Sequence, residues 1–528
     1  MSSIEKVLDK YSSKVYKNRK KHILEKTDEV QEIAADVRTM PGVMTNRGCC
    51  YAGCKGVVLS PIKDAAVITH GPIGCGFYTW GTRRHKAKGD EDTKNFLEYC
   101  LSTDMQEADI VFGGEKKLRQ AIKETVEIFD PATIVICSTC PVGLIGDDIH
   151  AVAAEAEKLY GRKVMAYSCE GYKGVSQSGG HHIASNGLIK HVIGTGDRIP
   201  KKFAINILGE YNIGGDGWEI TRILKRIGYD IICSLPGDGS YVEIKSAHVA
   251  DLNLVQCHRS INYVAEMMKE QYGTPWLKVN FIGVEGTIEA LRNMAKFFDD
   301  AELTAKTEEV IADEVANILD DMEYYKSKLK GKTAALFVGG SRSHHYQTLL
   351  KELDMETILA GYEFGHRDDY EGREVIPTIK QDGDSKSIES IKVEKVPDKY
   401  KVFLSEERYE KLKEEIGLES YGGMIKDMEN GSLIVDDLNH YETEEFLKLL
   451  KPDVFFSGIK DKYVAQKGGI LSRQLHSYDY SGPYAGFSGA VNFARDVTMG
   501  IYTPAWSFVR APWKVEPILE GQVAGGEA

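Results

Sequence analysis

One pattern occurs three times along this chain of 528 residues: an apolar strand, a pair of glycines, an amphipathic helix and a second apolar strand. The copies are ADIVFGGEKKLRQAIKETVEIFDPATIVIC at 108–137, FAINILGEYNIGGDGWEITRILKRIGYDIICSL at 203–235 and KTAALFVGGSRSHHYQTLLKELDMETILAGYEF at 332–364. Each copy is typical of a βαβ unit, whose two strands run parallel in one sheet. The sequence therefore predicts an α/β protein of three Rossmann-like domains, with parallel sheets flanked by helices.

Two polar segments, GTGDRIPKK and KSKLKGK, each directly precede a predicted strand and mark the expected domain boundaries. They predict an N-terminal α/β domain at 1–200, a second at 201–330 and a third at 331–528. Residues 303–330 are charged and amphipathic, and we expect them to form a packing helix.

Residues 374–423 differ from their surroundings because they are rich in charge. They contain a possible strand, KYKVFLS, and a possible helix, SEERYEKLKEEIG. We expect this segment to be a surface insertion within the third domain.

Composition excludes several classes of protein. Hydrophobic residues make up 42% and charged residues 27% of the chain, which is ordinary for a globular protein. The net charge of −13 argues against a nucleic-acid binder, which needs a basic footprint. The basic stretch RKKHILEK at 19–26 is expected to be a solvated helix face. No apolar run approaches the length of a bilayer, and the N-terminus lacks the apolar stretch of a signal peptide, so we expect a cytoplasmic protein with no membrane partner.

The glycine pairs follow the predicted strands, and open α/β sheets bind ligands at the carboxyl ends of their strands. None of the three pairs belongs to a full GxGxxG dinucleotide fingerprint, and a tight strand-to-helix turn explains each of them alone. The chain also has no GxxxxGK[ST] loop, so ATP is not expected to bind here.

Three of the ten cysteines lie beside glycine or proline: Cys49 in RGCCYAGCKGV, Cys75 in HGPIGCGFYTW and Cys140 in CSTCPVGLIGDD. Small residues let the backbone approach something bulky. Three thiolates are too few for a closed four-ligand zinc or iron–sulfur site, so a second chain would have to complete the count. Cys137 and Cys140 form a CxxC, typical of a zinc half-knuckle or a redox pair, but no second CxxC exists.

The remaining cysteines and several other groups have structural explanations. Cys50 and Cys54 are interpreted as buried neighbours of the first motif. Cys257 ends the apolar run DLNLVQC before a helix, where core packing explains it. His476 follows GGILSRQLH, and a lone histidine is more often a hydrogen-bonded structural residue. A thiolate nevertheless suits iron–sulfur chemistry, and an imidazole suits a harder metal.

Two further features could belong to a site. His181 and His182 are adjacent at a helix start, so they point to different faces and at most one reaches a shared site. Arg83, Arg342 and Lys460 follow glycine near a strand or turn. Basic groups at such places can hold an anionic ligand, although surface solvation is the default for each.

Together these segments resemble the nitrogenase molybdenum–iron proteins, and among their chains the alpha subunit. The resemblance runs nearly end to end, through RGCCYAGCKGVV, ITHGPIGC, TCPVGLIGDDI, CEGYKGVSQS, GEYNIGGD, LNLVQCHRSINY, GYEFGHRDDY and LHSYDYSGPYAGF. Such a number of long motifs in order is highly specific. The insertion at 374–423 looks like the one carried by clostridial-type members.

The resemblance implies two metal cofactors. Cys49, Cys75 and Cys140 would supply this chain's half of an 8Fe–7S P-cluster at the interface with a beta subunit. Cys257 would bind the terminal iron of the iron–molybdenum cofactor, 7Fe–Mo–9S–C, and His476 would bind its molybdenum beside homocitrate.

The resemblance also implies the residues that surround the second cofactor. Gln177 and Lys460 would lie on the homocitrate side, His181 against the reactive iron–sulfur face, and Val57 would crowd that face. The full set implied around the cofactor is Val57, Arg83, Gln177, His181, Tyr211, Arg259, Ser260, Arg342, Glu363, Phe364 and Lys460.

The activity implied by the resemblance is the reduction of dinitrogen to ammonia with evolution of hydrogen, in a heterotetramer of two alpha and two beta chains that takes electrons from an ATP-hydrolysing iron protein. The chain departs from the usual pattern at Cys50, where alanine is common, at Tyr478, where many members have tryptophan, and in GGSRSHH. Arg342 stands where vanadium and iron-only relatives tend to have lysine, which favours molybdenum. A vanadium or iron-only nitrogenase subunit and a cofactor-assembly scaffold remain the alternatives.

Overall fold

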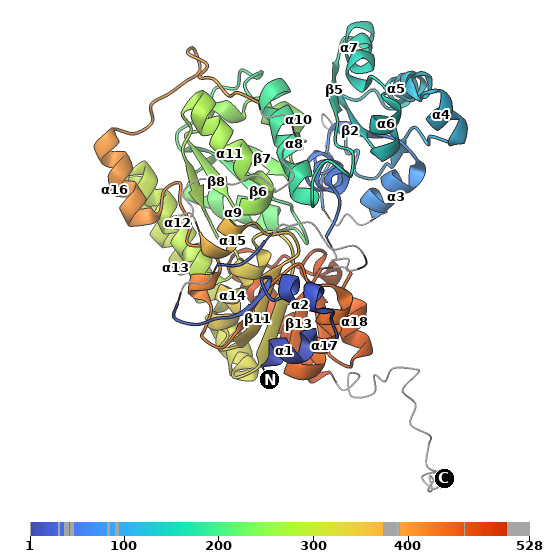
Figure 1. The fold of residues 1–528 in the computed structure, drawn as a ribbon. Helices are drawn as coiled ribbons and strands as arrows, with labels where there is room; N and C mark the ends of the chain where they lie inside the picture. The colour runs from blue at the N-terminus through green and yellow to red at the C-terminus, as the bar shows by residue number, and fades with distance from the viewer. Residues whose placement is uncertain are drawn as a thin grey trace, which may run out of the picture.

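The computed structural model of the chain describes residues 2–29, 32–35, 42, 47–81, 85–89, 94–372, 388, 391–458 and 460–503. It contains three sheets, each flanked by helices (Figure 1). Within these sheets every strand pairing is parallel except that of β1 with β12. The predicted α/β fold with three Rossmann-like sheets is therefore confirmed.

The first sheet has the strand order β3-β2-β4-β5. Its strands are β2 (Ala65–His70), β3 (Leu101–Ser102), β4 (Thr133–Ser138) and β5 (Lys163–Tyr167). Alternate residues of β4 enter different cores: Ile136 packs with α5 (Glu115–Phe129) and α7 (Ile149–Tyr160), and Val135 packs with α8 (Gln177–His191). A strand buried on both faces is a continuous apolar run, which is why β4 could be recognised in the sequence.

The strand expected at the start of the first repeat is wrong, because Glu107–Phe112 forms the helix α4. The backbone N–H of Gln106 donates to Asp109 Oδ2 over 2.8 Å, which caps the helix start. The apolar residues behind the prediction are exposed, with Val111 at 67% and Phe112 at 87%. Their apolar character therefore does not reflect burial in a sheet. The glycine pair, helix and second strand of this repeat are as expected.

The second sheet has the order β7-β6-β8-β9 and contains the whole second repeat. Its strands are β6 (Ala204–Glu210), β7 (Asp230–Pro236), β8 (Leu252–Val255) and β9 (Trp276–Lys278). The helices of this region are α9 (Asp216–Ile227), α10 (Tyr241–Ile244), α11 (His258–Tyr272) and α12 (Val284–Phe298).

The third sheet has the order β1-β12-β11-β10-β13-β14 and contains the third repeat as predicted. Its strands are β1 (Ile23–Glu25), β10 (Thr333–Phe337), β11 (Glu356–Tyr362), β12 (Leu433–Asp436), β13 (Val454–Ser457) and β14 (Leu471–Gln474). The helices of this region are α14 (Arg342–Glu352), α17 (His440–Leu450), α18 (Lys462–Lys467) and α19 (Gly486–Tyr502).

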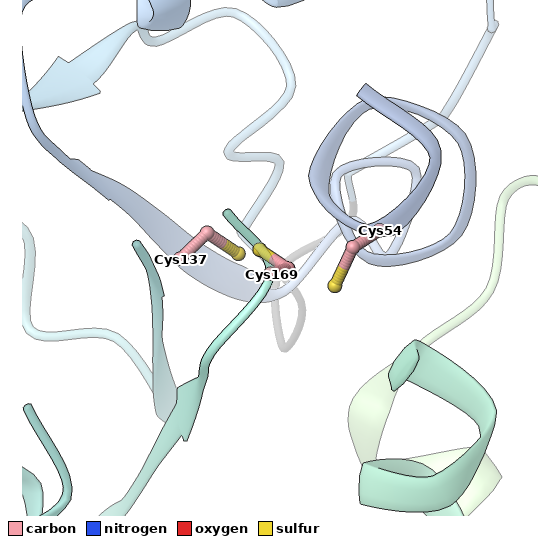
Figure 2. A group of neighbouring side chains, drawn as sticks. All are labelled: Cys54, Cys137 and Cys169. Carbon is pink, nitrogen blue, oxygen red and sulfur yellow. The ribbon is translucent and has the colours of Figure 1, made fainter. Parts of the chain in front are cut away.

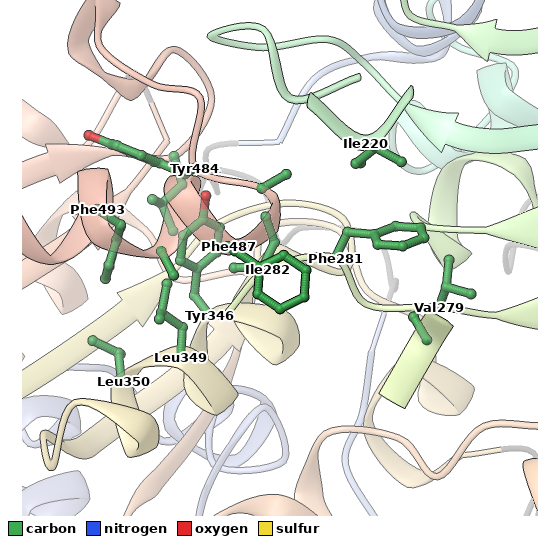
Figure 3. Packing of buried hydrophobic residues seen from close by; sticks show 14 of the residues in the cluster. Ile220, Val279, Phe281, Ile282, Tyr346, Leu349, Leu350, Tyr484, Phe487 and Phe493 are labelled. Atoms are coloured by element: carbon green, nitrogen blue, oxygen red, sulfur yellow. The ribbon is translucent and has the colours of Figure 1, made fainter. Parts of the chain in front are cut away.

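One continuous apolar core joins the second and third sheets. Ile220, Val279 and Phe281 come from the second region, and Tyr346 and Phe487 from the third (Figure 3). The long helix α13 (Ala301–Leu329) packs against α9, α12 and α19. The packing helix expected at 303–330 is thus confirmed, and it fixes these two sheets relative to each other.

The N-terminal segment belongs with the third sheet. The helices α1 (Ser3–Leu8) and α2 (Ser13–Arg19) lie beside the third sheet (Figure 1), and the strand β1 that follows them pairs antiparallel with β12. The solvated helix face expected at 19–26 is wrong. Arg19 is buried and donates from Nε and Nη2 to both carboxylate oxygens of Glu442, at 2.7 and 2.8 Å. The buried carboxylate of Glu442 pairs with Arg19 and so holds the N-terminal segment against the third sheet. Because Glu442 is far away in the sequence, the local sequence could not reveal this partner.

The insertion is not confined to the surface. Within its described part, 388 and 391–423, the helix α16 (Glu406–Ile416) is confirmed, but KYKVFLS forms no strand. Leu412 is fully buried in the core shared by the second and third sheets. Tyr421 is buried as well, with its ring centroid 3.8 Å from that of His258. The sequence prediction rested on the high charge of the whole segment and therefore overlooked the few apolar residues that enter the core.

The division of the chain near residues 200 and 330 is kept as our proposal, with the amendment that residues 3–25 pack with the third sheet. In the part of the chain that the structure describes, none of the helices combines the length and the apolar character that crossing a membrane demands.

Candidate metal-cluster sites

A cavity of about 280 Å³ lies where strands of the second and third sheets end. Its walls include residues that lie one to three positions after the ends of β6, β8, β10, β11, β13 and β14. Strand order reverses between β6 and β8 and between β10 and β13, and such switch points are where open parallel sheets hold ligands. Of the residues implied around a cofactor, those lining this cavity are Val57, Gln177, His181, Tyr211, Cys257, Ser260, Arg342, Glu363, Phe364, Lys460 and His476.

Cys257 enters the cavity from the second sheet, at the N-terminal cap of α11. Glycines make room for it. A Cβ on Gly340 would lie 3.0 Å from Cys257 Sγ, and one on Gly209 would lie 2.7 Å from its backbone nitrogen. Both glycines have positive φ, +67° and +79°, which a residue with a side chain rarely adopts. The thiol thus lies in a pocket that only glycine permits.

His476 enters the same cavity from the third sheet, just beyond β14. Burial and the cationic groups of Arg342 and Lys460 lower the pKa of His476 to about 3. The imidazole is therefore neutral near pH 7 and has a lone pair for a metal ion. A Cβ on Gly458 would lie 3.1 Å from His476 Nδ1, so a side chain there would crowd the ring.

Charged groups of both signs meet in this cavity. Burial and Asp216 raise the pKa of Glu210 to about 7, while Arg342 opposes that rise. Burial raises the pKa of Glu363 to about 8, and the cationic Lys460 opposes it. Arg342 also donates to the hydroxyl of Tyr478. Arg342 and Lys460 thus bring two cationic groups to one cavity, where an anionic ligand would pair with them.

A third wall is formed by helix α8 and the π-helical segment Ala52–Leu59 (η1), which contributes Val57. The two helices approach very closely: a Cβ on Gly53 would lie 1.9 Å from Gln177 O, and one on Gly180 would lie 2.0 Å from Cys50 O. This contact places Val57, Gln177 and His181 around one space.

The paired histidines separate as predicted. His181 lines the cavity, with its ring centroid 6.0 Å from that of Phe364. His182 does not line it and instead stacks on Tyr263, with ring centroids 4.5 Å apart and an angle of 15° between the planes.

One of the implied cofactor residues, Arg259, does not line the cavity. Arg259 is buried beside it, with Nη2 3.2 Å from Asp368 Oδ1 and Nε 2.9 Å from Asp369 Oδ2. Its guanidinium is thus engaged by two carboxylates. Arg83 lies outside the described residues.

The thiols of Cys49, Cys75 and Cys140 form a second group, on the surface of the first sheet. Cys75 lies in α3 (Ile73–Gly81) after β2, and Cys140 begins α6 (Cys140–Ile145) after β4, so both lie where the order of that sheet reverses. A Cβ on Gly171 would lie 3.0 Å from Cys140 Sγ and 3.3 Å from Cys49 Sγ. The pKa of Cys75 is raised by partial burial and by the nearby thiols of Cys49 and Cys140. The structure therefore brings the three thiols together, with Cys49 and Cys75 exposed.

Both groups of residues fit metal clusters. Soft thiols, a neutral imidazole and cradles that only glycine permits suit a bulky inorganic ligand. Residues that sequence reasoning missed also line the cavity, among them His85, Glu210, Gln256 and His345. Gln256 is adjacent to Cys257, and His345 lies one helical turn beyond Arg342, so proximity to a recognised residue was the available signal.

Comparison with known proteins gives a consistent picture. Residues 49–502 match the family described as nitrogenase component 1 type oxidoreductase. The chain is 59% identical to the nitrogenase molybdenum-iron protein alpha chain of Clostridium pasteurianum, covering 99% of both chains. It is 57% identical to the protein of the same description from Methanosarcina barkeri, covering 98% of this chain and 97% of that one.

Among solved structures, the chain is similar to one described as nitrogenase Cp1 at pH 6.5, with a TM-score of 0.94 and 59% identity, over 97% of this chain and 100% of that chain. The resemblance inferred from the motifs is confirmed, and this chain belongs to the nitrogenase component 1 family of oxidoreductases.

Proposed function

We propose that this chain is the alpha subunit of a molybdenum nitrogenase, which reduces dinitrogen to ammonia and evolves hydrogen. The observation that supports this most strongly is the cavity itself, which combines one thiol, Cys257, and one neutral imidazole, His476, from different sheets. Soft and harder ligands in one cavity suit a cluster with iron at one end and molybdenum at the other.

In this proposal the iron–molybdenum cofactor with homocitrate is bound by Cys257 and His476, and it supplies the multi-electron reduction chemistry. Arg342 and Lys460 would balance negative charge on the cofactor and homocitrate. Gln177 would donate hydrogen bonds on the homocitrate side. His181 would hold a proton at its imidazole beside the space that Val57 narrows.

The second cofactor of the proposal is the P-cluster, held by Cys49, Cys75 and Cys140 together with a beta subunit. Exposed apolar side chains around these thiols support a partner there, because such patches mark interfaces. They lie on α3, α4 and α6 and are Ile73, Phe77, Tyr78, Val111, Phe112 and Leu144. The proposal further includes two alpha and two beta chains in the cytoplasm, with electrons supplied by an ATP-hydrolysing iron protein.

Metal analysis of the purified two-chain complex tests this proposal directly. We expect molybdenum with iron, and ammonia formation that requires the iron protein and ATP. Vanadium, or iron without a second metal, would instead identify one of the alternative nitrogenases. A complex that holds the cofactor without any turnover would identify an assembly scaffold.

A further inference from the structure

Three cysteines other than the implied cluster ligands lie together inside the chain. The Sγ atoms of Cys54, Cys137 and Cys169 are all within 4.8 Å of one another (Figure 2). Cys54 comes from the π-helical segment, Cys137 from β4, and Cys169 from the turn after β5. All three side chains are fully buried. Three segments that are far apart in the sequence therefore place their thiols close together.

This inner group is distinct from the surface thiols. Cys49 is exposed whereas Cys54 is fully buried, and Cys140 is partly exposed whereas Cys137 is fully buried. The proposed P-cluster therefore does not account for the inner group. The Cys169 thiol donates a weak hydrogen bond to Ser138 O over 3.6 Å.

The spacing suits a metal ion with three ligands. Three sulfurs at about 2.3 Å from a central ion lie about 4 Å apart, a separation within the observed limit. Within the described residues the group offers three ligands, whereas structural zinc is almost always bound by four. Three-coordination by sulfur in a closed site is suited to copper(I) among the soft metals that thiolates select.

We propose that Cys54, Cys137 and Cys169 form a closed, three-coordinate site for one copper(I) ion. The site is internal to this chain and needs no residue from a partner. Because all three ligands are buried, the ion would enter while the chain folds.

The test uses the purified two-chain complex, produced without oxygen in medium supplemented with copper and then washed with a copper(I) chelator. We expect one copper per chain, with three sulfur ligands by X-ray absorption and an unchanged iron content. Cys137→Ser and Cys169→Ser should each abolish the bound copper. Cys233→Ser alters another buried cysteine, whose Sγ lies 3.3 Å from Asn206 Oδ1, and should retain it.

Absence of stoichiometric copper in the unsubstituted complex would overturn the proposal, and this measurement does not depend on whether the variants fold. Copper that persists in Cys137→Ser would also overturn it. Copper gained at the expense of iron would mean that the surface thiols had bound it in place of iron, which again contradicts the proposal.

Discussion

His181 is the residue around the cavity whose role the chain itself can best isolate. It lines the cavity, whereas the adjacent His182 stacks on Tyr263 outside it. The same substitution of histidine can therefore be made at one position that lines the cavity and at an adjacent position that does not.

We predict that His181→Asn slows dinitrogen reduction more than proton reduction. Asparagine can still donate a hydrogen bond but cannot carry a proton near neutral pH. The ratio of ammonia to hydrogen formed should fall in this variant and stay unchanged in His182→Asn. Equal losses of both products in His181→Asn would indicate a structural role.

His22 should make the fold sensitive to acid. Burial and the nearby Arg19 lower the pKa of His22 to about 3 in the folded chain. An unfolded histidine has a pKa of about 6.5, so the unfolded state takes up the proton first as the pH falls. The contribution is fully present above pH 6.5 and is lost between pH 6.5 and 3, at up to about 1.4 kcal/mol per pH unit.

Urea unfolding at pH 7 and pH 5 measures this effect. His22→Gln should lose less stability between the two pH values than the unsubstituted chain. His150→Gln, at an exposed histidine, should behave like the unsubstituted chain. An unchanged pH dependence in His22→Gln would show that protonation of His22 does not destabilise the fold.

At the scale of elements, the insertion gives the clearest contrast between sequence and structure. We predict that Leu412→Ala in α16 destabilises the protein by ~2–5 kcal/mol, because it leaves a cavity in a shared core. Val402→Ala, at a side chain that is 81% exposed, should change stability by less than about 0.5 kcal/mol. Thermal or urea unfolding compares the two variants. A negligible change in stability for Leu412→Ala would indicate that the insertion contributes nothing to the core and lies on the surface alone.

The repeats show how far sequence can predict the elements. The second and third repeats were recognised completely, because their first strands, β6 and β10, are buried along most of their length and are therefore largely apolar. The first repeat failed at Val111 and Phe112, whose apolar side chains are exposed on a helix. An apolar run indicates a surface that favours burial. It does not show whether that surface packs into a sheet of the same chain or is left for another chain to cover.

The site was predictable only in part. Cys257 and His476 each had an adequate structural explanation, and no spacing rule joins residues more than two hundred positions apart. The resemblance to the family assigned Cys257 and His476 to one cofactor. The fold explains how they can share it, because both residues follow strands that end at the same cavity. The inner cysteine group had no sequence signal, because Cys169 lies far from Cys54 and Cys137 and in no shared motif.

At the scale of the whole molecule, the exposed thiols imply an incomplete site. Cys49 and Cys75 are exposed, and apolar side chains surround them. We predict that this chain, expressed without its partner and supplied with iron and sulfide, cannot hold an intact eight-iron centre, whereas the two-chain complex can. Iron analysis and electron paramagnetic resonance compare the two. Recovery of the centre in the isolated chain would refute its placement at an interface.

We propose that the cavity between the second and third sheets binds a molybdenum-containing cluster through Cys257 and His476. The molybdenum and iron content of the purified Cys257→Ala complex tests this binding, with Cys233→Ala as the control at a buried cysteine outside the cavity. We expect Cys257→Ala to lose molybdenum and dinitrogen reduction while it retains the iron of the interface clusters. Full molybdenum content with normal ammonia formation in that variant would show that Cys257 does not hold the cluster.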